Sequence, residues 1–212
     1  MVVEIGSEIR IRDASKELYD WAQENLIIPN PQYRERERRG LWVGNTPKYL
    51  WLYHVDGSDL IVPTGVGKQV RQFLSEKDQI YVHLADNGLL DYKGTIPLYD
   101  YQKEAVEVMQ RTSCGILQSP CGSGKTQMGI ALAAELGRKV LWVTHTQDLL
   151  IQSKTRAEQY FSSETLGTIT AGKAQVGSHI TFATVQTLCK MDLEQFRYTW
   201  DVVIVDECHR LA

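Results

Sequence analysis

Apolar residues in the second half of the chain occur in short continuous runs, a pattern typical of strands buried on both faces of a sheet. Four such runs are expected to be strands: 115–118, 140–144, 179–184 and 202–205. Helical spacing between these runs predicts helices over residues 125–136 and 147–160. Strands that alternate with helices predict a parallel sheet, and right-handed crossovers then place helices on both of its faces.

Polar and apolar positions in the first part of the chain alternate over short stretches separated by turns. Residues 4–12 alternate as a strand does, and residues 14–26 carry apolar side chains at helical spacing. Residues 49–55 and 60–62 flank an Asp-Gly-Ser-Asp turn and predict a hairpin. These features predict a small α+β domain before the α/β domain.

Length and composition limit the number of domains and exclude several classes of protein. The 212 residues are 43% hydrophobic, enough to close two cores, which we place at residues 1–95 and 96–212. The net charge is -3, so a polyanion would have to be held by a local basic site. The longest stretch without acidic or basic residues, 174–189, is rich in polar side chains and predicts no membrane span. Charged residues near the start exclude a secretory segment there, so we expect a cytoplasmic, intracellular protein.

The four cysteines show neither the spacing of a zinc site nor that of a disulfide framework. They are Cys114, Cys121, Cys189 and Cys208. We expect reduced thiols, and the simplest interpretation is that each one is a small buried apolar residue.

A phosphate-binding loop at residues 119–126 is the strongest signal for chemistry. Its sequence, Ser-Pro-Cys-Gly-Ser-Gly-Lys-Thr, lies between an apolar run and an Ala-rich helix. Glycines let backbone N–H groups turn onto phosphates, and the helix N-terminus adds positive potential. Lys125 would reach the β- and γ-phosphates and Thr126 would bind Mg²⁺, while Ser119 stands where the general pattern has glycine. The expected nucleotide-binding residues here are Pro120, Cys121, Gly122, Ser123, Gly124, Lys125 and Thr126.

Two carboxylates, Asp206 and Glu207, follow the apolar run at 202–205. Ligands bind parallel sheets at the carboxyl ends of strands, so Asp206 is a candidate ligand of Mg²⁺. Glu207 is a candidate base that orients and deprotonates an attacking water. With Lys125 these carboxylates are the expected catalytic residues. An Asp-Glu pair after a strand is common on protein surfaces, so the interpretation depends on the phosphate-binding loop.

The loop together with Asp206-Glu207-Cys208-His209 resembles the superfamily 2 nucleic-acid helicases and translocases of the DEAH/DExH branch. The resemblance covers about residues 97–212, and the sequence is most similar to motors of type III restriction subunits and of phage and repair helicases. It implies a P-loop RecA-like parallel sheet that uses ATP and Mg²⁺. It also implies that His209 couples the nucleotide to the nucleic acid, where a histidine that merely caps a strand end is the simpler alternative.

The same resemblance implies binding roles outside the loop. Tyr101 and Gln102 match a Tyr-Gln pair that reads adenine in related motors. Tyr99 stands where related motors often have a basic residue. Packing in the core explains Tyr101 equally well. Polar residues at strand ends would contact the backbone phosphates of a nucleic acid, expected to be DNA. These are Thr144, His145, Thr146, Gln152, the segment 170–173 with Gly172 and Lys173, and Thr184. Helix capping is the simpler explanation for any single one of them.

The basic segment 33–40, Tyr-Arg-Glu-Arg-Glu-Arg-Arg-Gly, is followed by Trp42 and is a further candidate contact for a phosphate backbone. Glu35 and Glu37 offset part of its charge, and a solvated helix face explains the alternating signs equally well.

Related motors continue with a second RecA-like lobe that bears arginine fingers, and with a strand that inserts beside the Asp-Glu strand. We therefore expect this sequence to be the ATP-binding half of an ATP-dependent helicase or translocase. The second lobe would come from a longer chain or from another polypeptide, and these 212 residues alone would turn over ATP negligibly. The alternative is a non-catalytic module that binds nucleotide and nucleic acid and regulates a partner helicase.

Overall fold

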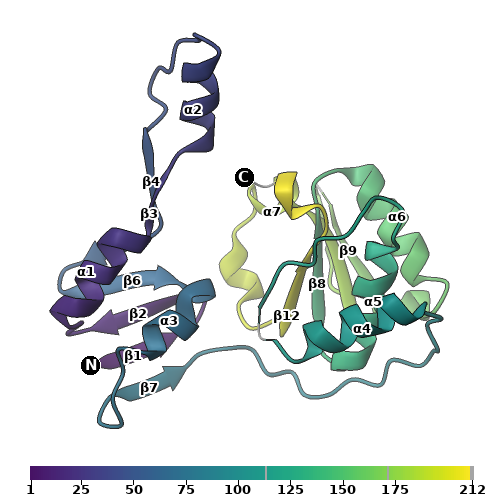
Figure 1. The fold of residues 1–212 in the computed structure, drawn as a ribbon. Coiled ribbons are helices and arrows are strands. Elements are labelled where there is room, and N and C mark those ends of the chain that lie inside the picture. Colours follow the sequence, from purple (N-terminus) through teal and green to yellow (C-terminus); the bar gives the residue numbers. More distant parts are fainter. Residues whose placement is uncertain (113, 171, 211–212) are drawn as a thin grey trace. The chain divides into compact units, whose positions relative to one another are not determined.

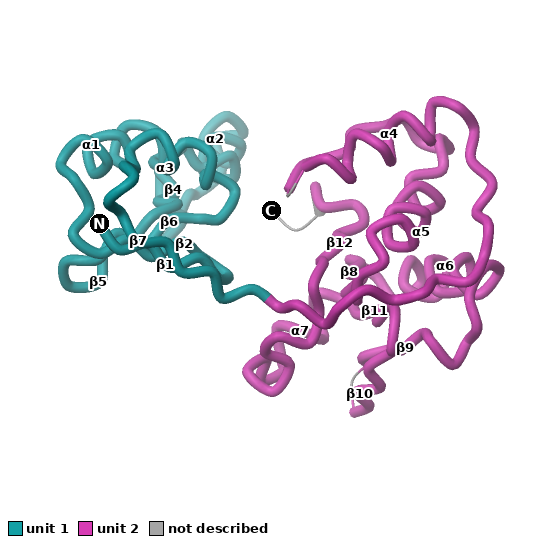
Figure 2. The backbone as a smooth tube through the Cα atoms, turned by 90° about the horizontal axis from the view of Figure 1, so that it is seen from below, with its two compact units in different colours: residues 1–84 teal, residues 85–212 magenta. Residues whose placement is uncertain are grey.

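The computed structural model describes residues 1–112, 114–170 and 172–210 and divides into two compact units, residues 1–84 and 85–212 (Figure 2). Residues 85–95, which we expected in the first domain, bond to the second unit. The Asn87 amide donates to Asp201 over 2.8 Å, and the Tyr92 hydroxyl donates to the carbonyl of Arg138 over 2.8 Å. This segment therefore runs past the amino ends of the strands in the second unit.

The first unit is an α+β fold around a five-stranded sheet with the order β5-β6-β2-β1-β7 (Figure 1). Its strands are β1 (Val2–Ile5), β2 (Glu8–Arg12), β5 (His54–Asp56), β6 (Asp59–Pro63) and β7 (Gln79–Val82). Its core also contains residues of α1 (Lys16–Asn25) and α3 (Gly67–Arg71), which follows the short helix η1 (Thr64–Val66). The single strand expected at 4–12 is two strands, because the chain turns back at Gly6 and Ser7.

A two-stranded ribbon extends from the first unit and carries a helix (Figure 1). It consists of β3 (Ile27–Pro29) and β4 (Tyr49–Trp51), which flank α2 (Pro31–Arg38), and we call residues 27–51 the arm. Asn30 caps α2 by accepting a hydrogen bond from the Gln32 N–H over 2.9 Å. The strand expected at 49–55 is thus divided, because Tyr49–Trp51 pairs with β3 and His54–Asp56 pairs with β6.

The second unit contains a mostly parallel sheet with the order β10-β9-β11-β8-β12 (Figure 1). Its strands are β8 (Val140–Thr144), β9 (Leu166–Thr170), β10 (Lys173–Gln175), β11 (Ile180–Thr184) and β12 (Val202–Val205), of which β10 is antiparallel. The remaining elements are α4 (Asp100–Gln110), α5 (Lys125–Leu136), α6 (Gln147–Ala157), α7 (Val185–Leu188), η2 (Ser163–Thr165), η3 (Leu193–Phe196) and η4 (Cys208–Arg210).

Helices cover both faces of this sheet, as expected of a RecA-like domain. Alternate residues of β8 point to opposite faces, so Trp142 packs with α5 and α6, and Val143 packs with α7 and η3. The helix α4 lies against α5 through Val106 and Met128. The fold prediction, a RecA-like α/β domain preceded by a small α+β domain, is confirmed.

Two further local predictions are wrong. Residues 115–118 form no strand, and Ile116 is exposed. Among the described residues, β12 is an edge strand whose one neighbour is β8. The run at 115–118 therefore has no strand beside it with which its backbone could pair. The four cysteine side chains are exposed rather than buried. Within the part of the chain that is described, no helix has both the length and the apolar character needed to cross a bilayer.

Candidate nucleotide and nucleic-acid site

The phosphate-binding loop leads into α5 and closes around the ammonium group of Lys125. Gly124, at the N-cap of α5, has φ 81°, a left-handed conformation that glycine adopts at little cost. Lys125 Nζ donates to the carbonyls of Ser119 and Pro120, both over 3.3 Å. The Ser119 hydroxyl donates to that of Ser123 over 2.7 Å, so the serine that replaces glycine ties the loop across its base. The amino end of α5 thus lies within a loop held by its own hydrogen bonds.

Two side chains of α4 fasten the loop from outside. The Gln102 side chain donates to the carbonyl of Ser123 over 2.9 Å, and the Tyr101 hydroxyl donates to the same carbonyl over 3.1 Å. Gln102 also accepts a hydrogen bond from the N–H of Tyr99 over 2.9 Å and is buried. The Tyr-Gln pair therefore lies against the phosphate-binding loop, and Tyr101 is half exposed rather than a core residue.

Asp206 lies at the carboxyl end of β12 and faces the start of α5. The Thr126 hydroxyl donates to its carboxylate over 3.5 Å, and the backbone N–H of Asp206 donates to the carbonyl of Val143 over 2.9 Å. Burial raises the pKa of the Asp206 carboxyl, and the neighbouring charge of Glu207 raises it further. The Glu207 N–H, the Thr126 hydroxyl and the Lys125 charge act in the opposite direction but do not cancel the increase. The structure thus gathers hydroxyl, carboxylate and ammonium groups in one place.

Glu207 follows in a left-handed conformation with φ 54°, which is uncommon for a residue with a side chain. Its carboxylate lies 3.2 Å from Nδ1 of His209. Both side chains reach solvent, and His209 is the more exposed of the two. Residues held in sparsely populated backbone regions occur often at functional sites, and here the conformation belongs to the turn that follows β12.

This donor set fits Mg²⁺ and a polyphosphate. Hydroxyl and carboxylate oxygens are the ligands that Mg²⁺ prefers, and Thr126 and Asp206 present one of each across 3.5 Å. Lys125 places a positive charge beside them at the start of α5, where backbone N–H groups also point outward.

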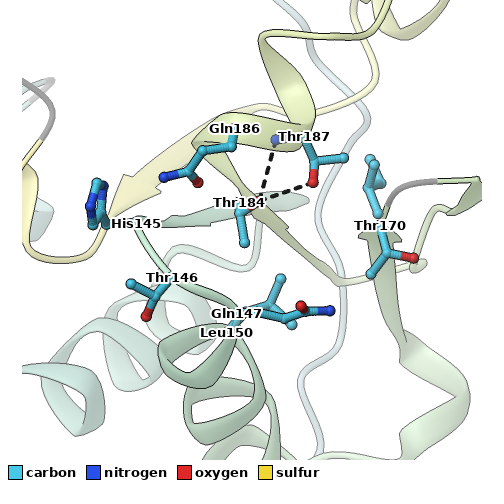
Figure 3. Close-up of a pocket in the computed structure, with 9 residues that line it drawn as sticks. His145, Thr146, Gln147, Leu150, Thr170, Thr184, Gln186 and Thr187 are labelled. Atoms are coloured by element: carbon cyan, nitrogen blue, oxygen red, sulfur yellow. Dashed lines mark hydrogen bonds between the residues drawn. The ribbon is translucent and has the colours of Figure 1, made fainter.

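A depression lies at the carboxyl ends of the parallel strands β8, β9 and β11 and has a volume of about 380 Å³ (Figure 3). Its lining is mostly hydroxyl, amide and imidazole groups. The lining residues are His145, Thr146, Gln147, Leu150, Ile169, Thr170, Thr184, Gln186 and Thr187. The Thr146 hydroxyl caps α6 by accepting from the Leu149 N–H, and the Thr184 hydroxyl caps α7 by accepting from the Thr187 N–H, both over 3.3 Å.

The candidate nucleic-acid residues divide by position. His145, Thr146, Thr170 and Thr184 line this depression. Thr144 is buried, and its hydroxyl donates to the carbonyl of Thr146 over 3.0 Å. Three further candidates, Gln152, Gly172 and Lys173, are exposed and are not part of the lining. Ala171, from the expected segment 170–173, lies outside the described residues.

Gln147, Gln186 and Thr187 also line the depression, and sequence reasoning missed them. A signal for the two glutamines exists in the sequence. A threonine caps the helix that follows β8 and another caps the helix that follows β11, and a glutamine comes one or two positions later, as in Thr146-Gln147 and Thr184-Val185-Gln186. A capping threonine at a strand end orients the first turn of the helix, so the amide that follows it lies at the same edge of the sheet.

The arm gathers basic and aromatic side chains on the first unit. Trp42 is 85% exposed, and Tyr49 and Trp51 of β4 are also exposed. The helix α2 ends in Arg36 and Arg38, both exposed. One of the opposing acidic residues of α2 is engaged locally, since Glu35 pairs with Arg39 over 2.6 Å.

Comparisons with known proteins show which family the chain resembles. Residues 95–212 match the family described as type III restriction enzyme, res subunit. The DNA 3'-5' translocase XPB2 of Sulfurisphaera tokodaii is 29% identical over 148 residues, which cover 68% of this chain and 33% of that protein. The chain therefore spans about a third of the length of this curated relative.

A solved structure gives the likeness in fold. The crystal structure of the UvsW helicase from bacteriophage T4 superposes with a TM-score of 0.66 at 21% sequence identity, over 100% of this chain and 83% of that one. The family match covers more than half of the chain and includes the loop, Asp206 and Glu207. The chain belongs to the family of type III restriction enzyme res subunits and carries the N-terminal region of a superfamily 2 helicase-like motor.

Proposed function

We propose that the chain binds Mg-ATP between the phosphate-binding loop and Asp206, as the ATP-binding half of a DNA helicase or translocase. The observation that carries the proposal is the 3.5 Å between Thr126 Oγ1 and Asp206 Oδ2. These two oxygens come from segments far apart in the sequence, and together they suit one divalent cation. Lys125 supplies the positive charge for the β- and γ-phosphates.

Glu207 is the proposed base for hydrolysis, and Asp206 and Lys125 are the proposed stabilising charges. Bound Mg²⁺ would neutralise charge on the β- and γ-phosphates. The contact of Glu207 with His209, 3.2 Å long, supports a role for His209 in holding the carboxylate toward a water. An arginine from a second RecA-like lobe would complete the site, as in phosphoryl transfer generally.

The depression at the ends of β8, β9 and β11 is the proposed track for one strand of DNA. Its hydroxyl and amide groups suit contacts with sugar and phosphate that carry no base sequence, as translocation requires. DNA is favoured over RNA because the similar protein from Sulfurisphaera tokodaii is named a DNA translocase.

Hydrolysis tests the proposal in a protein that joins this chain to a second lobe. Single-stranded DNA should stimulate ATP hydrolysis and RNA should not. Glu207→Gln should abolish turnover and keep ATP binding, whereas Glu164→Gln, at an exposed carboxylate of η2, should change neither. Hydrolysis that persists in Glu207→Gln would contradict the assigned base. Nucleotide binding with no DNA-stimulated hydrolysis in the two-lobe protein would favour a non-catalytic regulatory module.

The arm is the proposed accessory contact with DNA. Trp42 and Trp51 can stack on bases while the arginines of α2 contact phosphates. Trp42→Ala should weaken single-stranded DNA binding by the whole chain roughly 5- to 150-fold, the range expected when one stacking side chain is removed.

Arg36→Ala with Arg38→Ala should reduce the slope of log affinity against log salt by about 0.7 for each phosphate that the arginines no longer neutralise. An unchanged slope would argue against a phosphate contact at α2.

A further inference from the structure

Asn87 binds the turn that leads into β12, although the two lie far apart in the sequence of the second unit. Its backbone N–H donates to the Asp201 carboxylate over 2.8 Å. Its side-chain nitrogen lies 2.8 Å from the same oxygen of Asp201. That nitrogen is also 3.2 Å from the carbonyl oxygen of Tyr198 and 3.3 Å from that of Thr199. One residue therefore holds both the backbone and the carboxylate of the turn 198–201.

This turn contains a residue in an unfavourable backbone conformation. Tyr198 has φ 60°, in the left-handed region that residues with large side chains seldom adopt. Such a conformation persists only where the surroundings fix it, and the Asn87 side chain donates to the carbonyl of this same residue. Removing the Asn87 side chain therefore takes away a contact that holds the turn in its strained form.

The turn also fixes the amino end of β12. The other oxygen of the Asp201 carboxylate accepts the Lys139 N–H over 3.0 Å, and the Asp201 N–H donates to the Lys139 carbonyl over 2.9 Å. In the described part of the chain β12 pairs with β8 alone, so few bonds besides those at its two ends hold it. At its carboxyl end the Asp206 N–H donates to the carbonyl of Val143 over 2.9 Å.

We propose that Asn87 is a positioning residue for Asp206: it fixes the turn at one end of β12 and thereby the carboxylate at the other end. This inference rests on the proposed function, in which Asp206 and Thr126 hold Mg²⁺. The strand has only four residues, so a shift at its first bonds to β8 also reaches its last ones. Removing a group that bonds directly to a metal ligand typically weakens metal binding about 10- to 100-fold, and a group that acts through a strand should contribute less.

Mg²⁺-dependent nucleotide binding by the 212-residue chain tests this role. N-methylanthraniloyl-ATP is titrated with and without Mg²⁺ into the original chain and into Asn87→Ala. The variant should reduce the gain in affinity that Mg²⁺ gives by about three- to tenfold and leave the affinity without Mg²⁺ within about twofold. Tyr92→Phe is the matched control, since it removes the hydroxyl that bonds the same segment to the carbonyl of Arg138. It should leave the Mg²⁺ gain unchanged.

Two further measurements separate positioning from a general loss of stability. Hydrogen exchange in the nucleotide-free Asn87→Ala chain should be faster at the Asp206 N–H and unchanged at that of Ala183, which lies in β11 between two strands. Adding Tyr198→Gly, which relieves the strain, should restore part of the Mg²⁺ gain. The proposal is overturned if Asn87→Ala keeps the full gain, if exchange at Asp206 is unchanged, or if Tyr198→Gly restores nothing. Absence of any Mg²⁺ gain in the original chain would instead contradict the proposed Mg-ATP site.

Discussion

Gly122 and Gly124 show how much of the loop depends on single residues. Both have φ 81°, yet a Cβ at Gly122 would meet open space, and a Cβ at Gly124 would reach Nε2 of Gln102. An alanine at either position adopts a left-handed conformation that costs about 1–2 kcal/mol. Only the alanine at 124 also displaces the amide that holds Ser123, a hydrogen bond worth about 0.5–1.5 kcal/mol.

We therefore expect Gly124→Ala to lower the free energy of unfolding more than Gly122→Ala does, by about 1 kcal/mol. Chemical denaturation without nucleotide measures the difference. Adding Gln102→Ala should cost less in the Gly124→Ala background than in the original chain, because the hydrogen bond is already broken there. Equal losses for the two glycine variants would argue that Gln102 does not hold the loop.

A pH effect on stability is expected at Asp206. Its pKa is raised in the folded chain, so the folded state binds this proton more tightly than the unfolded state does. Stability then falls as pH rises from the ordinary value of 3.8 through the folded pKa, and it stays reduced at neutral pH. Asp206→Asn should consequently raise the melting temperature at pH 7 without Mg²⁺, and the gain should shrink as the pH falls toward 4. A gain that is the same at both pH values would show that charge burial is not its cause.

At the scale of elements, α5 approaches β8 so closely that glycine is required between them. A Cβ at Gly129 would lie 2.6 Å from the ring of Trp142, which is 1% exposed and has no room to move. Gly129→Ala should therefore destabilise the chain by about 1–3 kcal/mol, although alanine is the better helix former. Thermal unfolding measures this. In a Trp142→Phe background, where the contacting part of the ring is absent, Gly129→Ala should be neutral or stabilising. A loss of stability that persists in this background would show that the contact with Trp142 is not its cause.

Sequence patterns predicted the elements whose signal is local. The continuous apolar run at 140–144 predicted β8 with its observed bounds, and β12 and α5 also begin and end where expected. The strand β9 was missed because Gly167 and two threonines interrupt its apolar pattern. Gly167 is required by a tertiary contact, since its Cβ would lie 2.1 Å from the N–H nitrogen of Gly177. The apolar residues at 115–118 predicted a strand, but pairing depends on a neighbour that no local pattern specifies.

The candidate site was predictable to a similar degree. The candidate residues of the loop, Asp206 and Glu207 are marked by residue order, so the sequence alone predicts them as a site. The direction of the Gln102 amide toward Ser123, and the grouping of Gln186 with His145, depend on how separate segments pack. Neither arrangement follows from the repeating pattern of apolar and polar residues in the sequence.

At the scale of the whole molecule, nucleotide and DNA are proposed to bind at separate places along one chain. The second unit is proposed to bind Mg-ATP at one part of its sheet edge and DNA at another, and the arm of the first unit is proposed to hold DNA. Nucleotide and DNA affinities should then respond to different residues. Trp42→Ala should leave Mg-ATP affinity unchanged, and Lys125→Ala should leave single-stranded DNA binding without nucleotide within about twofold, as judged by fluorescence anisotropy. Loss of both activities in either variant would contradict this separation.

The most direct test is titration of the chain with N-methylanthraniloyl-ATP, with and without Mg²⁺. Lys125→Ala should weaken binding about tenfold or more, a loss of about 1.4 kcal/mol or above, while Lys68→Ala on the exposed surface of α3 should not. Asp206→Asn should abolish the gain in affinity that Mg²⁺ gives the original chain. Nucleotide affinity that is the same in all four proteins, with the same dependence on Mg²⁺, would contradict the claim that Lys125 and Asp206 form one Mg-ATP site.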